Sequence, residues 1–382
     1  MQRKHYDADQ LAFVDTVRTF IGKEITPHFL DWEGAGLVPR ELFQAAGATG
    51  LLGLQVPESF GGGGTEDFRF NQALGEELAL SGTGGAALGI TLHNDICLPY
   101  FLRYASEEQQ QRWLPGIASG ELITAIAMTE PGAGSDLAGI RTSGVTDGSD
   151  LIVNGAKTFI TNGINADLVI TAVRTSPDKH RGLTLVVLER GMPGFERGRN
   201  LDKLGQHSQD TAELSFTDVR VPAENVLGEP GQGFFQLVAN LPQERLSIAL
   251  GAVASARAAL NWTIEYVRSR KAFGHSLGAL QNTRFVLAEV ATEVDIAQTF
   301  IDRCVSAHNE GDLSVEDAAK AKWWATELQG RAIDKCLQLH GGYGFMMEYP
   351  IARAFADARV TRIYGGATEV MKEIIGRSLK LS

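Results

Sequence analysis

The chain has 382 residues, 44% of them hydrophobic and 21% charged, which excludes a disordered tail and a fibrous protein. It carries 35 Lys and Arg against 46 Asp and Glu, and the net charge of −11 argues against binding to nucleic acid or to an anionic lipid surface. The length is sufficient for two or three structural units and for a buried cofactor site.

The cysteines and the N-terminal segment indicate the cellular environment. Cys97, Cys304 and Cys336 are dispersed and form no CxxC pair, so we expect neither a disulfide framework nor a metal site. The first residues lack the pattern of a secretory signal, and no run reaches the roughly 18 consecutive apolar residues of a membrane span. We therefore expect a cytoplasmic protein without a membrane helix or a bound metal.

The first part of the chain, residues 1–122, has the apolar spacing of helices. The pattern begins at Asp7, which forms a capping-box pair with Gln10, and continues to Glu24. Further helical patterns cover residues 41–50, 70–80 and 107–117. These segments predict an N-terminal α-helical domain.

The sequence pattern changes to one typical of β-strands over residues 123–228. Residues 151–153 and 156–160 are β-rich and flank Asn154-Gly155, a dipeptide that strongly favours a hairpin turn. More β-rich runs cover 168–173, 183–188 and 212–221. Because no long helical pattern separates these runs, we expect an antiparallel, barrel- or sandwich-like sheet that ends near Pro222.

Helical spacing returns over residues 229–382, with patterns at 234–270, 280–308, 314–340 and 351–379. Long helices joined by short loops are typical of a four-helix bundle. The predicted fold class is therefore α+β, with the domain order helical, β, helical. A Rossmann fold is excluded, because no GxGxxG follows a strand.

Five segments contain candidates for chemistry. Each has an ordinary interpretation when taken alone: a tight Gly-rich loop, a core aromatic residue in a strand, or a solvated charge at a helix end. In chain order they are Met128–Asp136, Lys157–Gly163, Arg268–Gly274, Gln338–Gly344 and Ile363–Glu369.

Together and in this order, the five segments resemble the acyl-CoA dehydrogenase family over nearly the whole chain. Leu241–Leu246 and Tyr364-Gly365-Gly366 are most similar to the long-chain and isovaleryl type. The resemblance implies FAD-dependent α,β-dehydrogenation of an acyl-CoA thioester to the trans-2-enoyl-CoA, as in fatty acid β-oxidation. A carboxylate removes the α-proton in this reaction, and flavin N5 accepts the β-hydride.

The resemblance also implies that FAD binds in an extended form between subunits. It places Met128, Thr129, Ser135, Phe159 and Thr161 beside the flavin ring. It assigns the pyrophosphate and adenosine to Arg270, Gln281 and a loop from across a subunit boundary, formed by Gln338, Leu339, His340, Gly341 and Gly342. Two further positions near the cofactor are Glu369 and Ala367, where most members have a hydroxyl residue.

The base is the deciding residue. Most members carry it directly after the Tyr of the Tyr-Glu-Gly sequence, but this chain has Gly365 there, and the vacancy alone would suggest an inactive protein. In the long-chain and isovaleryl type the base lies in a Glu-Arg-Leu segment, which points to Glu244. A surface carboxylate paired with an arginine is the ordinary alternative for Glu244, and Glu369 is the second candidate for the base.

The resemblance implies substrate contacts from Ser135, Arg245, Gly365 and Gly366, in which the Gly365 N–H and a flavin ribityl hydroxyl hold the thioester carbonyl. Burial is expected to raise the pKa of the base towards working pH. The implied partners are an electron-transfer flavoprotein and further copies of the chain in a homotetramer. Two alternatives stay open: an acyl-CoA oxidase, and a non-catalytic subunit with the same fold.

Overall fold

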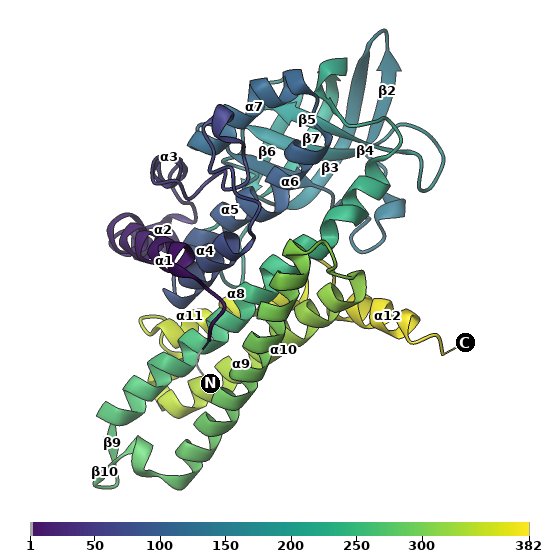
Figure 1. The fold of residues 1–382 in the computed structure, drawn as a ribbon. Coiled ribbons are helices and arrows are strands. Elements are labelled where there is room, and N and C mark those ends of the chain that lie inside the picture. Colours follow the sequence, from purple (N-terminus) through teal and green to yellow (C-terminus); the bar gives the residue numbers. More distant parts are fainter. Residues whose placement is uncertain (1–2, 382) are drawn as a thin grey trace.

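The computed structural model describes residues 3–381, and its first part is helical as predicted (Figure 1). Asp7 caps the first helix by accepting the Asp9 N–H at 3.0 Å, while Gln10 accepts the Asp7 N–H at 3.0 Å. The structure adds three short helices that the sequence did not indicate. The helices are α1 (Ala8–Phe20), α2 (Phe29–Ala35), α3 (Glu41–Ala48), α4 (Arg69–Leu80), α5 (Gly84–Thr91), α6 (Leu98–Tyr104) and α7 (Glu107–Ser119), with π-helical turns at Ile21–Ile25 and Leu92–Cys97.

A sheet follows in the strand order β6-β7-β3-β2-β4-β5-β8, with β1 paired to β4. Most pairs are antiparallel, but β1 and β4 are parallel, and β2 touches β4 in parallel through Ser143 and Arg174. The sheet is thus mainly antiparallel as predicted, with parallel pairing only at β1–β4 and at the one contact between β2 and β4. The strands are β1 (Thr124–Ala127), β2 (Ser143–Asp147), β3 (Asp150–Thr161), β4 (Leu168–Arg174), β5 (Leu183–Glu189), β6 (Phe195–Asn200), β7 (Thr211–Val221) and β8 (Val226–Leu227).

The predicted hairpin turn at Asn154-Gly155 is wrong. The turn lies between β2 and β3 at residues 148–149, and Asn154 and Gly155 lie inside β3 at a register shift against β7. Asp218 of β7 accepts from Asn154 Nδ2 at 3.0 Å and donates its N–H to Asn154 Oδ1 at 2.9 Å. The dipeptide thus forms an irregularity in the strand, because the asparagine is held across the ladder instead of reversing the chain.

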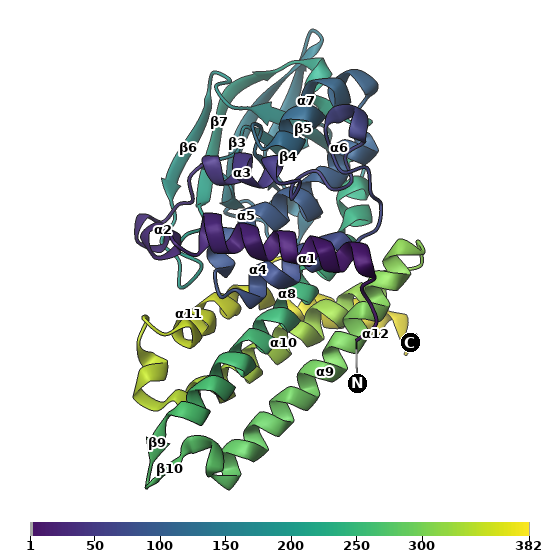
Figure 2. The same cartoon turned by 60° about the vertical axis from the view of Figure 1, so that its left-hand side comes forward.

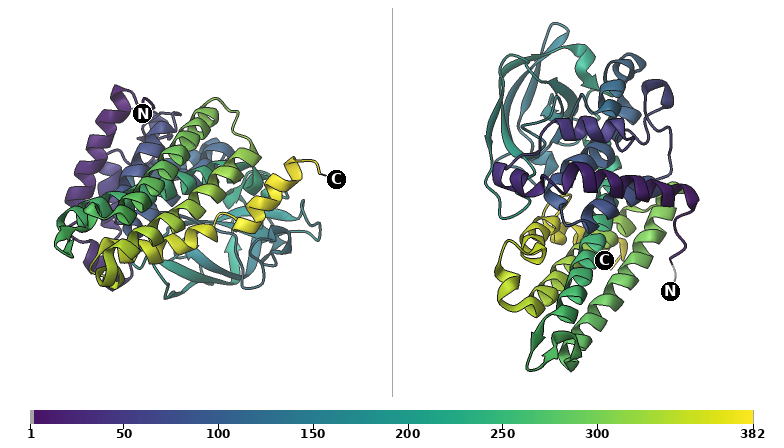
Figure 3. Two further views of the ribbon diagram at one scale, coloured as in Figure 1. Left: turned by 90° about the horizontal axis from the view of Figure 1, so that it is seen from below. Right: turned by 90° about the vertical axis from the view of Figure 1, so that its left-hand side faces the viewer.

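The last part of the chain contains three long helices that run side by side (Figure 3, left). The predicted helix 351–379 is wrong as one element, since a 3₁₀ turn at Ala358–Arg362 and a glycine loop divide it. Gly365 and Gly366 have φ of 63° and 103°, which a continuous helix does not allow. The elements are α8 (Gly233–Ser269), β9 (Lys271–Ala272), β10 (His275–Ser276), α9 (Gln281–Asn309), α10 (Val315–His340), α11 (Pro350–Asp357) and α12 (Thr368–Ser378).

Helix α8 connects the two halves of the molecule. Figure 2 shows α1 and α4 between the sheet above and the long helices below. Helix α8 packs on α4, on the π-helical turn Leu92–Cys97 and on β5, and lower down on α9 and α10. The predicted fold class is confirmed in its helical, β, helical order. Over residues 3–381, no helix combines the length and the apolar character needed to cross a membrane.

Candidate active site

Glu244 lies on α8 where this helix passes α6. Its side chain is buried, with 3% of the residue exposed, and its Oε1 accepts a hydrogen bond from the Tyr100 hydroxyl at 2.9 Å. Burial raises the pKa of Glu244 to about 7, although the Tyr100 hydrogen bond and the Arg245 charge both lower it. The interpretation as a surface carboxylate is excluded, and the group has the protonation equilibrium of a general base near neutral pH.

The loop at residues 363–367 packs against α8, where Arg245 and Ile248 contact it. Arg245 is buried there, and its Nε donates to the Gly365 carbonyl at 3.5 Å. A Cβ built on Gly365 would lie 2.3 Å from Ile248 Cδ1, and the φ of 63° already disfavours a side chain. The packing on α8 therefore requires glycine at Gly365, the position that the resemblance assigns to the base in most members of the family but not in the long-chain and isovaleryl type.

Two buried side chains of this site were missed in the sequence. Tyr100 binds Glu244, and Lys322 of α10 donates from Nζ to the Gly366 carbonyl at 2.6 Å. Both are fully buried. Neither belongs to a recognisable motif, and both are far from Glu244 in the chain. A lysine among apolar residues in a helix was the one available signal for Lys322.

The segment after β1 is bound closely to β3. The Thr158 N–H donates to the Thr129 carbonyl at 2.9 Å, and Lys157 donates to the Met128 carbonyl at 3.1 Å and to Glu130 Oε1 at 2.9 Å. Lys157 and Glu130 are both buried, so this ion pair holds residues 128–130 against β3. The predicted flavin residues Met128 and Thr129 thus lie directly beside the strand that carries Phe159 and Thr161.

Phe159 and Thr161 are on β3. Phe159 has φ of 60° and is 66% exposed, at a register shift between Lys157 and Ile160. An aromatic residue held outwards in a strained backbone conformation is characteristic of a binding surface. Thr161 is half-buried, and Ser135 is exposed in the preceding loop.

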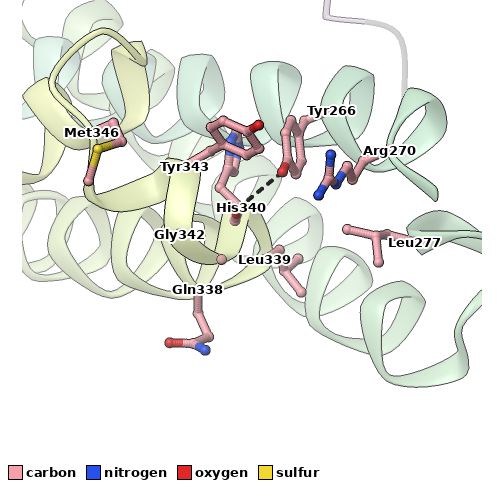
Figure 4. A pocket seen from close by; sticks show the side chains of 10 residues that line it. Tyr266, Arg270, Leu277, Gln338, Leu339, His340, Gly342, Tyr343 and Met346 are labelled. Atoms are coloured by element: carbon pink, nitrogen blue, oxygen red, sulfur yellow. Dashed lines mark hydrogen bonds between the residues drawn. The ribbon is translucent and has the colours of Figure 1, made fainter. Parts of the chain in front are cut away.

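A second group of predicted residues lines a cavity of about 600 Å³ at the other end of the molecule (Figure 4). Tyr266 stacks on His340 with ring centroids 4.2 Å apart and donates from its hydroxyl to the His340 carbonyl at 3.1 Å. Arg270 is exposed at the cavity edge. The predicted members of the lining are Arg270, Gln338, Leu339, His340, Gly341 and Gly342.

The remaining predicted residues lie elsewhere. Gln281 is the exposed first residue of α9 and is not part of the cavity lining. Ala367 caps α12, and Glu369 is exposed in its first turn. Within one chain, the site is therefore divided into a group around Glu244, a group on β3 and a group near β9 and β10, the hairpin farthest from the sheet (Figure 1).

Metal chemistry has no ligand set in the described chain. Residues 3–381 contain no group of three or more His, Cys, Asp or Glu side chains arranged to hold a metal ion. Cys97, Cys304 and Cys336 are buried free thiols.

Comparison with protein families gives matches in all three parts of the chain. Residues 7–121 match the model described as acyl-CoA dehydrogenase, N-terminal domain, residues 125–219 match the middle domain, and residues 231–380 match the C-terminal domain. The chain belongs to the acyl-CoA dehydrogenase family.

Individual members of the family align over nearly their full length. A mitochondrial long-chain specific acyl-CoA dehydrogenase of Sus scrofa is 46% identical over 99% of this chain and 88% of its own length. A mitochondrial isovaleryl-CoA dehydrogenase of Oryza sativa subsp. japonica is 32% identical over 98% of this chain and 92% of its own length. The predicted enzyme class, an acyl-CoA dehydrogenase, and the predicted likeness to the long-chain and isovaleryl type are confirmed.

Solved structures agree with these matches. An acyl-CoA dehydrogenase from Geobacillus kaustophilus superposes with a TM-score of 0.97 at 48% identity and covers 100% of both chains. A glutaryl-CoA dehydrogenase from Mycobacterium smegmatis in complex with FADH₂ superposes with a TM-score of 0.93 at 28% identity, covering 99% of this chain and 96% of that one. The acyl-CoA dehydrogenase fold thus extends over the whole chain.

Proposed function

We propose that this acyl-CoA dehydrogenase converts an acyl-CoA thioester to the trans-2-enoyl-CoA, and that Glu244 removes the α-proton. The observation that carries the proposal is the environment of Glu244: a buried carboxylate whose pKa is raised to about 7, beside a loop in which Gly365 has no side chain. A base with a pKa near the working pH is largely ionised and still strong enough to abstract a proton.

The Gly365–Gly366 loop supplies the second element of the reaction. Removal of an α-proton leaves negative charge on the thioester oxygen, and a backbone N–H near that oxygen stabilises the charge. The absence of a side chain at Gly365 allows the thioester to approach its amide. Gly366, Arg245 and Ser135 complete the proposed substrate contacts.

The residues fit FAD as the cofactor. The exposed, strained Phe159 offers an aromatic face, Thr161 and Thr129 offer hydroxyl and backbone groups, and Arg270 suits a pyrophosphate. When bound, FAD supplies the oxidant that accepts the β-hydride. Met128 and Ser135 complete the proposed contacts with the flavin ring; Gln281, Gln338, Leu339, His340, Gly341, Gly342, Ala367 and Glu369 complete those with the rest of the cofactor.

We also propose a homotetramer that passes electrons to an electron-transfer flavoprotein. The distance between β3 and the Arg270 group within one chain supports a cofactor site completed by a second subunit (Figure 1). The intact Glu244 site favours this function over that of a non-catalytic subunit, and an acyl-CoA oxidase is distinguished by rapid reaction of the reduced protein with oxygen.

The substitution Glu244→Gln tests the proposal. Glutamine keeps the shape and the acceptor for Tyr100 but does not take up a proton, so we expect FAD content to be unchanged and the rate of flavin bleaching by acyl-CoA to fall by about 10³-fold. The measurement is anaerobic stopped-flow absorbance with a panel of acyl-CoA chain lengths.

The matched comparison is Glu369→Gln, which removes the other candidate carboxylate. We expect this variant to retain proton abstraction once it is saturated with FAD. Wild-type rates in Glu244→Gln, or their loss in Glu369→Gln alone, would show that the base is assigned to the wrong residue.

A further inference from the structure

Lys322 is a buried cation with a single bound partner in the described chain. It is 0% exposed, its Nζ donates to the Gly366 carbonyl at 2.6 Å, and no carboxylate of residues 3–381 lies within ion-pair distance of it. A buried charge without a counter-ion costs several kcal/mol, so proteins rarely retain one for packing alone. The contact with the glycine loop is the feature that distinguishes this lysine.

Arg245 makes the corresponding contact one residue earlier. Its Nε donates to the Gly365 carbonyl at 3.5 Å, and it too has no ion pair in the part of the chain that the structure describes. Two buried cations, one from α8 and one from α10, therefore hold two consecutive carbonyls of one loop. These carbonyls belong to the peptide units that carry the Gly366 and Ala367 N–H groups, whereas the Gly365 N–H of the proposed thioester contact lies in the preceding unit. The two cations therefore act on that contact by holding the loop in place.

Charged groups from three helices surround the loop. The charges that act on Lys322 come from Arg245 on α8, Glu327 on its own helix and Glu369 on α12. Glu369 is exposed, so solvent screens it, and Glu327 also contacts Arg362, with 3.5 Å between Arg362 Nε and Glu327 Oε2. Protonation of Glu244 during the reaction removes the negative charge next to Arg245. The surroundings of the loop therefore favour negative charge on the thioester oxygen in the same step in which Glu244 takes up the α-proton.

We propose that Lys322 is a positioning residue for this reaction, which holds the Gly365–Gly366 loop through the Gly366 carbonyl and stabilises negative charge on the thioester oxygen. This rests on the proposed function. The α-C–H bond breaks, its proton goes to Glu244, its electron pair forms the Cα=C bond, and the carbonyl π pair moves to oxygen. Bound FAD would supply the oxidant for the β-hydride, so that the Cα=Cβ bond forms and the thioester carbonyl is restored. Lys322 acts on the oxygen through the loop and does not touch the substrate.

The test uses a ligand that carries the same charge without turnover. The ligand 3-oxodecanoyl-CoA has no hydrogen on its β-carbon, so it cannot lose a hydride, and its enolate has a near-ultraviolet absorbance. We expect Lys322→Met, which keeps length and removes charge, to raise the pKa of the bound ligand by about one unit relative to wild type. We expect kcat to fall by about tenfold to a hundredfold with little change in KM.

Lys320→Met is the matched control, because Lys320 lies on the same helix, is 45% exposed and pairs with Asp317 at the surface. FAD content and the thermal midpoint of each variant exclude a general folding defect, and Lys322→Gln replaces Lys322→Met where the apolar variant does not fold. An enolate pKa equal to that of wild type in a folded Lys322 variant would overturn the proposal.

The wild-type protein gives an independent result. Burial lowers the pKa of Lys322 to about 8, so the affinity for the enolate is expected to decline as pH rises through this value. Constant affinity from neutral to strongly alkaline pH would contradict the role of Lys322, whether or not the variants fold. Absence of flavin bleaching by any acyl-CoA in wild type would contradict the proposed function itself.

Discussion

Glu244 and Tyr100 lie 144 positions apart in the chain, yet their hydrogen bond defines the acid–base property of the site. Two opposing effects act on the carboxylate. Burial disfavours its charged form, and the phenol hydroxyl stabilises that form by donation. The resulting pKa of about 7 depends on both side chains, although only the carboxylate is the proposed base.

The substitution Tyr100→Phe removes the donor and leaves the ring. We expect the pKa of Glu244 to rise by about one unit, because the charged form loses its hydrogen bond while burial persists. The acid limb of kcat/KM against pH should therefore move upwards from about 7, with loss of activity at pH 6 and recovery at pH 8.

Tyr104→Phe is the control for the Tyr100 experiment, since Tyr104 is a neighbouring ring, with centroids 6.2 Å apart, that makes no hydrogen bond to Glu244. A pH profile of Tyr100→Phe that coincides with wild type would show that the hydrogen bond does not tune the base.

At the scale of elements, local sequence predicted the helices well and the irregular positions poorly. Asp7 and Gln10 fixed the start of α1 through a local interaction, so the capping box was readable in the sequence. Asn154-Gly155 was misassigned because the bond to Asp218 comes from another strand. The break in 351–379 was missed because contacts of Gly365 and Gly366 with α8 and α10 determine it, and such contacts have no local signal.

The same limit applied to the site. Glu244 was identified from the resemblance of its segment to a family type, whereas Tyr100 and Lys322 follow from tertiary packing alone. The motif therefore gives the proposed base, and the structure is needed to find the side chains that contact it and its neighbouring loop.

The glycine loop gives a prediction for an element. Gly365→Ala places a Cβ 2.3 Å from Ile248 Cδ1 at a φ of 63°. We expect a loss of about 1–2 kcal/mol in the free energy of unfolding, because backbone strain and displacement of Ile248 add together, and a fall in kcat as the loop shifts. Denaturant titration and steady-state kinetics measure the two effects.

Gly376→Ala on α12 is the matched control, since nothing lies within 4 Å of its Cβ position. Alanine is the better helix former there, so the free energy of unfolding of this variant should increase by about 0.5–1 kcal/mol. Equal stability of the two alanine variants would contradict the argument that Gly365 is required by packing.

At the scale of the molecule, the first described residues join the N-terminal domain to the long helices. Arg3 donates to Glu76 of α4 at 2.7 Å and to Asp302 of α9 at 2.7 Å. Burial alone would raise the pKa of Asp302, but hydrogen bonds from Arg3 hold it below its usual range. A depressed folded-state pKa stabilises the fold above the unfolded value, and the stabilisation is lost as pH falls into the acid range.

Arg3→Met tests this connection. We expect about 2 kcal/mol of destabilisation at pH 7, because Glu76, whose side chain is 6% exposed, loses its cationic partner and keeps only neutral donors such as Tyr6 and Gln72. The difference from wild type should shrink at acid pH, where Asp302 is protonated in both proteins. Thermal unfolding followed by circular dichroism between pH 3 and 8 measures it.

Arg18→Met removes a comparable ion pair, from α1 to Glu77, in which the arginine is 60% exposed. We expect the loss of this surface pair to lower the free energy of unfolding by less than about 0.5 kcal/mol. Equal effects of the two substitutions would contradict the role of Arg3 as the connection between the domains.

The register shift at Asn154-Gly155 in β3 affects the chemical stability of the protein. An asparagine followed by glycine is prone to deamidation, because the following backbone nitrogen attacks the side-chain amide. Asp218 holds both amide atoms of Asn154 across the ladder, with contacts of 2.9 and 3.0 Å, which keeps the side chain away from the attacking nitrogen. The folded sheet thus protects one of the two Asn-Gly dipeptides of the chain, and deamidation at Asn154 is expected to begin only when the strand opens.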